Sequence, residues 1–299
     1  MATEITVART LTRPMSKPIV RIPDKNEGTA RIPFSKMVAA GNDFIVIDNR
    51  THVLTEVLGQ FAVTMCDRRQ GVGADGVILI EHSDKADLKM RVINPDGREA
   101  EMCGNGARCV ALFAQTNHIA GKTVMIDTLA GEIEAHIGTK GVILIMGQPK
   151  DMQLGLKIKV KDAILDVHSI NTGVPHAIVF VNSIEKAPVA ELGRFLRHHP
   201  KFAPQGTNVD FVTLADKQTL RVRTYERGVE GETPACGTGI VASALISSAV
   251  RGYKSPVYVR TQGGDLLTVT FEKSGPFEDV RLEGPARLVY QGTLPRPVV

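Results

Sequence analysis

The sequence predicts an α+β protein made of two pseudo-symmetric α/β domains that arose by internal duplication, with an active site in the cleft between them. Three observations predict this fold class. The chain has 299 residues, the length of about two domains. Short runs rich in Val and Ile alternate with a few helical stretches. A motif of the form Glu-x-x-x-Cys-Gly-x-Gly occurs twice, around Cys103 and around Cys236.

The duplication extends well beyond the two motifs, which occupy residues 99–106 and 232–239. A glycine-led run begins 30 positions before each motif cysteine, and a further glycine follows each cysteine by 28 positions. Another matching pair, Gly41 and Gly173, lies 62 and 63 positions before the respective cysteine. Chance does not preserve four such registers, so the chain contains two copies of one fold.

The first copy is predicted to contain five strands and two helices. The strands are runs rich in Val and Ile that are bounded by Gly, Pro, Asn or Asp, at residues 44–48, 77–80, 89–93, 123–127 and 142–146. The helices are expected at residues 54–69 and 107–117, the second ending before Gly121 as its C-cap.

The second copy repeats this order. Strands are predicted at residues 177–181, 211–214, 220–225, 257–261 and 266–271. Helices are predicted at residues 184–198 and 240–250, with Gly252 as the C-cap of the latter. Many strands with two helices per copy predict an antiparallel α+β unit that is used twice.

These elements predict a first domain at residues 32–148 plus 283–299 and a second domain at residues 149–282. Residues 1–31 remain as an N-terminal extension that is disordered or lies on the surface. The extension has six Lys or Arg against three acids, so it supplies +3 of the net charge of +4. It has no apolar segment of a signal peptide, although its Arg and Thr content faintly resembles an organelle transit peptide.

Composition excludes several classes of function. With +1 left for the rest of the chain, no basic surface for nucleic acid is expected. No run approaches the roughly 18 apolar residues of a membrane span, so no membrane association is expected. Four cysteines, none spaced as Cys-x-x-Cys, predict neither a disulfide scaffold nor a metal site, and favour the cytoplasm. Cys66 and Cys109 fall within predicted helices and are expected to be packing thiols.

Each motif cysteine comes directly before a predicted helix. A helix start presents unpaired N–H groups and about half a positive charge, so we expect the pKa of each thiol to lie below the ~8.5 of free cysteine. The small residues that follow let a carboxylate approach the backbone amides. Two such starts facing each other suit the removal of a proton from one face of a carbon beside a carboxylate, with return of a proton to the other face.

Six segments together resemble the diaminopimelate epimerase family. They are the runs at residues 34–44, 67–76 and 94–109, the Gly-Thr-Asn at 206–208, and Tyr-Glu-Arg-Gly at 225–228 with Ala-Cys-Gly-Thr-Gly at 235–239. The resemblance covers about residues 32–292. It implies an isomerase that interconverts LL- and meso-diaminopimelate without pyridoxal phosphate, metal or other cofactor. It also implies a homodimer that acts in lysine and peptidoglycan precursor biosynthesis.

The resemblance also implies roles for individual residues. The catalytic pair corresponds to Cys103 and Cys236. The substrate contacts correspond to the side chains of Asn42, Asn94, Asn208, Glu226 and Arg227 and to the amides of Gly104, Asn105, Gly237 and Thr238. By side-chain chemistry, Arg227 suits the distal carboxylate of the substrate and Glu226 suits its distal ammonium group. His176 is a candidate to hydrogen-bond near a thiol.

The chain departs from the family pattern at Val174, where the family often has asparagine, so one contact to the distal end of the substrate is missing.

Two alternative functions stay open at this point. One is another cofactor-independent racemase or isomerase of the same fold: a PhzF-like isomerase would lack the thiols, and a proline-racemase-like enzyme would lack the Glu226–Arg227 pair. The other is a redox switch in which Cys103 and Cys236 form a regulatory disulfide.

Overall fold

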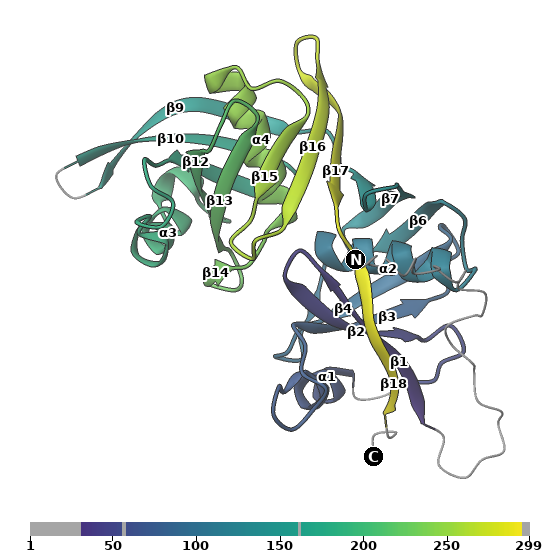
Figure 1. Ribbon diagram of the computed structural model, residues 1–299. Coiled ribbons are helices and arrows are strands. Elements are labelled where there is room, and N and C mark those ends of the chain that lie inside the picture. The colour runs from purple at the N-terminus through teal and green to yellow at the C-terminus, as the bar shows by residue number, and fades with distance from the viewer. Residues whose placement is uncertain (1–30, 56–57, 161–162, 295–299) are drawn as a thin grey trace, which may run out of the picture.

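A computed structural model describes residues 31–55, 58–160 and 163–294 of the chain. The predicted N-terminal extension lies outside the described residues, apart from Arg31. The described chain forms two lobes, one built largely from the first part of the sequence and the other from the second (Figure 1). Among the described helices, none is both long enough and apolar enough to cross a membrane.

The first part of the chain forms eight strands and two helices. The strands are β1 (Ile32–Ala39), β2 (Asn42–Asp48), β3 (Gly76–Glu81), β4 (Leu88–Ile93), β5 (Glu99–Ala100), β6 (Thr123–Thr128), β7 (Gly131–Ile137) and β8 (Val142–Ile145). The helices are α1 (Leu58–Cys66) and α2 (Gly104–Thr116). All five strands predicted here are confirmed, and β1, β5 and β7 are additional.

The second part forms ten strands and two α-helices. The strands are β9 (Lys150–Val160), β10 (Ala163–Asn171), β11 (Pro175–Phe180), β12 (Asn208–Leu214), β13 (Thr219–Glu226), β14 (Gly231–Thr233), β15 (Val257–Arg260), β16 (Leu266–Lys273), β17 (Phe277–Gly284) and β18 (Arg287–Leu294). The helices are α3 (Val189–Arg197) and α4 (Gly237–Arg251), with a 3₁₀ turn at Pro200–Phe202. The five strands predicted here are also confirmed.

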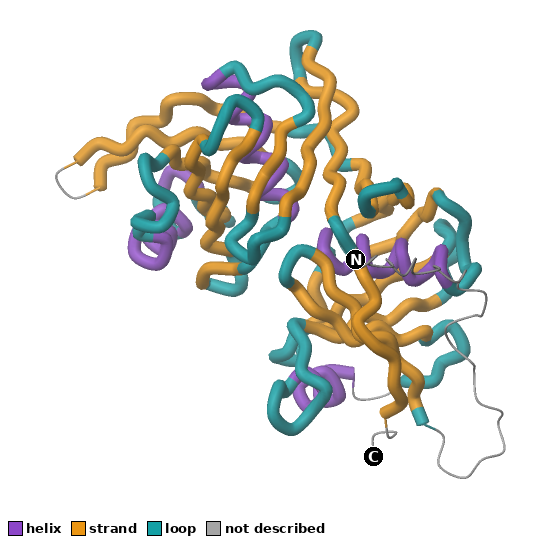
Figure 2. Tube along the Cα trace, in the orientation of Figure 1, coloured by secondary structure: helices purple, strands orange, loops and turns teal. Residues whose placement is uncertain are grey.

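We call β1 to β8 with β18 the first half, because β18 pairs with β1, and β9 to β17 the second half. The halves are joined through β17, which pairs with β16 on one side and with β8 on the other. The domain boundaries predicted at residues 148/149 and 282/283 stay a prediction. All described strands belong to one hydrogen-bonded sheet that curls around a helix in each half (Figure 2).

The expectation of a purely antiparallel unit is wrong. Each half contains two parallel pairs, which are β2–β3 and β4–β6 in the first half and β11–β12 and β13–β15 in the second. A helix follows the first strand of every one of these pairs, and a helical crossover is what allows the next paired strand to run parallel. The register of the first pair in each half matches, since Ile45 lies opposite Val77 and Ile178 opposite Asp210.

The long helices α2 and α4 begin three residues earlier than predicted, immediately after Cys103 and Cys236. Glycine has a low helix propensity, so the glycines of each motif led to a predicted helix start that is too late. Gly252 is confirmed as the C-cap of α4, with a left-handed φ of 73°. Gly121 is not a cap, because α2 ends at Thr116 and Asn117 caps it.

The two short helices are also shorter than predicted. Helix α1 covers only Leu58–Cys66 of the predicted residues 54–69, and α3 begins at Val189, after Pro188. A proline is accommodated at the start of a helix but not in its interior, which accounts for the late start of α3.

Both long helices are the centre of a core. In α4, every residue from Thr238 to Ser248 is buried, and the whole helix packs against strands on several sides. In α2, the buried face includes Val110 and Phe113, which pack against β6, β7 and β8. A helix buried nearly all round must be apolar nearly all round, as α4 is. This enclosure fixes where each helix start, with its cysteine, points.

Candidate active site

The two motif cysteines are the N-caps of α2 and α4. Cys103 and Cys236 have extended backbones, with φ of −142° and −115°. The first helical hydrogen bonds are made by the amides of Ala107 and Ile240, to the carbonyls of the two cysteines. The helices therefore do not use the amides of the intervening residues Gly104, Asn105, Gly237 and Thr238 in helical bonds, although the Asn105 amide also acts on the Cys103 thiol.

The structure brings the two helix starts together between the halves. The Asn105 side chain, in the first turn of α2, donates to the carbonyl of Ala235 at 3.5 Å, and Ala235 immediately precedes Cys236. The electrostatic field of Glu226, at the end of β13, acts on both Cys103 and Cys236. Residues from opposite halves are therefore brought close to one another at the two helix starts, and the single active site between them stays a prediction.

Cys236 is connected to a chain of buried polar groups. Its Sγ lies 3.4 Å from the hydroxyl of Thr238, which lies 2.9 Å from His176 Nε2. His176 Nδ1 lies 2.6 Å from a carboxylate oxygen of Asp210, and the Thr224 hydroxyl donates to the other oxygen at 2.6 Å. Thr238 thus lies between His176 and the Cys236 sulfur, and the role of His176 beside a thiol stays a prediction.

Asn208 extends this series of hydrogen-bonded groups toward Glu226 and Arg227, the residues predicted to bind the distal end of the substrate. Its side-chain amide nitrogen lies 3.4 Å from His176 Nε2, and its side-chain oxygen accepts from the backbone N–H of Arg227 at 2.7 Å. Asn208 is buried, whereas Glu226 and Arg227 are half-buried at the rim of the second half. The three residues are therefore brought together.

Cys103 has a different set of neighbours. Its Sγ accepts from the backbone N–H of Gly106 at 3.4 Å. Asn105 donates to the side-chain oxygen of Asn42 and accepts from the guanidinium of Arg108, while Asn42 donates to Asp75 at 2.9 Å. These bonds fix the orientation of both asparagine amides.

Asn94 is the predicted residue that is held by backbone hydrogen bonds. It lies in the turn after β4, where its N–H donates to the Arg98 carbonyl at 2.8 Å and its own carbonyl accepts from Gly97 at 2.9 Å. In the described part of the chain, the network around Asn42 does not include the Asn94 side chain.

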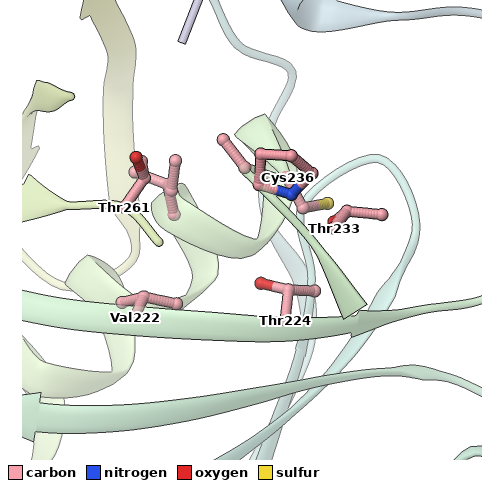
Figure 3. Close-up of a pocket in the computed structure, with 8 residues that line it drawn as sticks. Val222, Thr224, Thr233, Cys236 and Thr261 are labelled. Carbon is pink, nitrogen blue, oxygen red and sulfur yellow. The ribbon is translucent and has the colours of Figure 1, made fainter. Parts of the chain in front are cut away.

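A small cavity lies beside Cys236, between β13 and the start of α4. It is lined by Val222, Thr224, Thr233, Pro234, Ala235, Cys236, Ile240 and Thr261. The sulfur of Cys236 lies on the side of the cavity nearer Thr233 and away from Thr261 (Figure 3).

The family model of diaminopimelate epimerase matches residues 34–152 and 168–289, most of the described chain. The chain belongs to this family. The diaminopimelate epimerase of Aquifex aeolicus is 41% identical over 280 residues, covering 89% of this chain and 99% of that protein. That of a Hydrogenobaculum species is 42% identical over 274 residues, covering 87% and 97%.

Solved structures of more distant proteins share the fold of this diaminopimelate epimerase family member. A PhzF-family phenazine biosynthesis protein from Bacillus anthracis matches with a TM-score of 0.68 at 18% identity, covering 88% of this chain and 99% of that one. A probable proline racemase from Agrobacterium radiobacter matches with a TM-score of 0.65 at 17% identity, covering 89% and 93%. The predicted resemblance, fold class and isomerase activity are therefore confirmed.

The expectation that both thiols have lowered pKa values is wrong in this structure. Burial raises the pKa of Cys103 above its ordinary value, although the Gly106 N–H and the charge of Arg108 act in the opposite direction. Burial raises the pKa of Cys236 further above that value, and the charges of Glu226 and Asp210 add to the increase. Loss of hydration thus outweighs the helix starts in this diaminopimelate epimerase family member.

Sequence reasoning missed the groups that support the site, notably the buried Arg108 and Asp210 and the partly exposed Asp75. Nothing in the local sequence marks Arg108 and Asp210 as buried. The internal repeat did contain one signal, because Arg108 and Asp210 are each matched by valine in the other copy, at Val241 and Val77. Cys66 and Cys109 are both buried free thiols, as predicted.

Proposed function

We propose that this chain interconverts LL- and meso-diaminopimelate by a two-base proton transfer between Cys103 and Cys236. The observation that carries the proposal is the pair of cysteine N-caps, which come from opposite halves and both lie in the field of Glu226. Membership of the diaminopimelate epimerase family supports the choice of substrate.

In the proposed reaction, the thiolate of one cysteine takes the α-hydrogen from the substrate, and a new S–H bond forms. The electron pair left on Cα is delocalised into the adjacent carboxylate, which the unused amides of residues 104, 105, 237 and 238 stabilise. The opposite thiol then gives its proton to the other face of Cα. One S–H bond has formed and one has broken, so no proton is gained or lost overall.

The distal head of the substrate sets specificity in this proposal. Arg227 receives the distal carboxylate, Glu226 the distal ammonium, and Asn42, Asn94 and Asn208 supply directional hydrogen bonds. The connected bonds of Asn42 and Asn208 support these roles, because each amide is held in a fixed orientation. We further propose that the protein acts in the cytoplasm as a homodimer, in lysine and peptidoglycan precursor biosynthesis, without metal or pyridoxal phosphate.

The test is incubation of the purified protein with LL-diaminopimelate in D₂O, followed by chiral separation and mass spectrometry. Because each thiol carries a single proton, newly formed meso product should contain solvent deuterium from the outset, whereas recovered substrate should contain almost none at early times. Activity should survive dialysis against EDTA and treatment with hydroxylamine. Early deuterium in recovered substrate would contradict two separate bases.

The variants Cys103→Ala and Cys236→Ala should each lose epimerisation almost completely, because either thiol alone serves only one face of Cα. Cys66→Ala is the matched control, since Cys66 is a buried thiol on α1 outside the site, and it should remain active. Near-normal turnover by either of the first two variants would overturn the proposed catalytic pair.

A further inference from the structure

The two halves share one backbone plan, yet beside its motif helix each contains a buried charge that the other lacks. The starts of α2 and α4 align Arg108 with Val241, five residues after the respective cysteine. The strand registers align Val77 with Asp210, since Ile45 and Ile178 lie opposite them. Arg108 and Asp210 are each 0% exposed, so both charges lie within the cores beside the site.

Arg108 places a permanent positive charge beside Cys103. One guanidinium nitrogen donates to Asn105, while Nε and Nη1 have no hydrogen-bond partner among the described residues. No carboxylate of the described residues is hydrogen-bonded to the guanidinium, although the charge of Asp265 acts on it through space, and its own field favours the ionised form of the nearby Cys103 thiol. The Gly106 N–H that donates to the same sulfur acts in the same direction.

Asp210 has the opposite effect on Cys236. It is bonded to Thr224 and His176 and connected through Thr238 to the Cys236 sulfur, and its negative charge opposes a second negative charge there.

The remaining charged and titratable neighbours do not reverse this difference. The negative charge of Glu226 opposes ionisation of both thiols, and at Cys236 it acts more strongly than that of Asp210, so it adds to the protection of the Cys236 proton. Cys103 is also within electrostatic range of Cys109, a buried thiol whose own pKa is raised by burial. Cys236 is also linked to His176 through Thr238, and His176 is paired with Asp210.

We propose that Cys103 is the thiol that ionises while Cys236 keeps its proton, and that Arg108 and Asp210 are the positioning residues that set this order. The consequence of this order of ionisation for catalysis rests on the proposed function. The free enzyme is then ready to accept the α-hydrogen at Cys103 and to donate a proton from Cys236. After one turnover the order is reversed, and proton exchange with solvent restores it.

The test measures alkylation by iodoacetamide over a pH series, with peptide mass spectrometry to quantify Cys103 and Cys236 separately. Accessibility scales the rate at each thiol but does not move the pH at which that rate is half-maximal. We expect the midpoint for Cys103 to lie at least about one pH unit below that for Cys236, which corresponds to tenfold in ionisation.

Two substitutions should move the midpoints independently. Arg108→Met should raise the midpoint of Cys103 and leave that of Cys236 in place, and Arg108→Lys should restore it by returning the charge. Asp210→Asn should lower the midpoint of Cys236 only. Arg98→Met and Asp96→Asn are surface controls that should move neither, since Arg98 and Asp96 are largely exposed.

Melting temperatures identify a variant that does not fold, and Asp210→Asn provides an independent measurement if Arg108→Met is lost. A lower midpoint for Cys236 than for Cys103, or unchanged midpoints in both folded core variants, would overturn the proposal. Epimerase assays on the same samples separate the two claims. An inactive wild-type protein with the expected midpoints would contradict the proposed function alone.

Discussion

At the scale of single residues, Asp43 belongs to a cluster of charged side chains that contacts the proposed site through Asn42. Burial alone would raise the pKa of Asp43, but hydrogen bonds and charges from Arg68 and Lys36 outweigh it and lower that pKa to about 2. Arg68 also contacts Asp75 at 2.7 Å, and Asp75 holds the side chain of Asn42. The cluster therefore links an exposed arginine to a proposed substrate contact.

This pKa predicts a pH-dependent contribution to stability. A depressed carboxyl pKa stabilises the fold above the unfolded value of about 3.9, and that contribution disappears as pH falls through about 2. We expect Asp43→Asn to be less stable than wild type by roughly 1–2 kcal/mol at pH 5, after discounting for partial exposure of the cluster. Urea unfolding should show this difference shrinking between about pH 4 and pH 2. A constant difference would contradict the assignment.

Which site residues the sequence predicts depends on how they are recognised. Cys103 and Cys236 are predicted from the repeated motif, and the asparagines are predicted from the family resemblance. Both the motif and the family runs are continuous stretches of sequence, so they can be recognised without a structure. Arg108 and Asp210 could not be assigned in this way, since their importance comes from burial beside a thiol, which depends on how distant strands and helices pack.

At the scale of elements, the first turns of α2 and α4 pack differently against the strands beneath them. A Cβ on Gly239 would lie 2.3 Å from the Asp210 carboxylate, whereas a Cβ on the equivalent Gly106 would lie 3.0 Å from the methyl end of Ile78. The buried carboxylate is held by two hydrogen bonds and has little room to move, while the Ile78 methyl group can rotate away.

The two alanine variants should therefore behave differently. Gly239→Ala should lower the free energy of unfolding by about 2 kcal/mol through overpacking and should strongly reduce epimerisation, because Asp210 and His176 must shift. Gly106→Ala should cost less than about 1 kcal/mol, since the gain in helix propensity offsets part of the contact. Chemical denaturation and turnover measurements check both. Equal losses in the two variants would show that the Asp210 contact is unimportant.

The predicted and missed elements differ in the kind of residue that they contain. The ten predicted strands are rich in buried Val and Ile, whereas the missed β9 (Lys150–Val160) is largely exposed and contains three lysines. Its stability comes from pairing with β10, which a local pattern does not reveal. The parallel pairing within each half was missed for the same reason, since strand order depends on how the helices cross over.

At the scale of the whole molecule, the helices that begin at Cys103 and Cys236 come from opposite halves and start close together, so a bond between those cysteines would link the halves covalently. Mild oxidation should form a Cys103–Cys236 disulfide and abolish activity, and a reductant should restore it. Cys66 and Cys109 should stay reduced, because each is a buried free thiol outside the site, Cys66 in the core beside α1 and Cys109 in the core around α2. Peptide mapping after oxidation checks this, and a link involving Cys66 or Cys109 would contradict the arrangement.

The unmatched charges of Arg108 and Asp210 also bear on how the two-domain chain arose. A dimer of identical subunits related by a twofold axis presents the same side chain on both sides of a site on that axis. An ancestor of that kind could not have an arginine beside one thiol without a second arginine beside the other. Once gene fusion joined the copies, a mutation could alter one side alone. Fusion therefore allowed the two thiols of one site to acquire different charged neighbours.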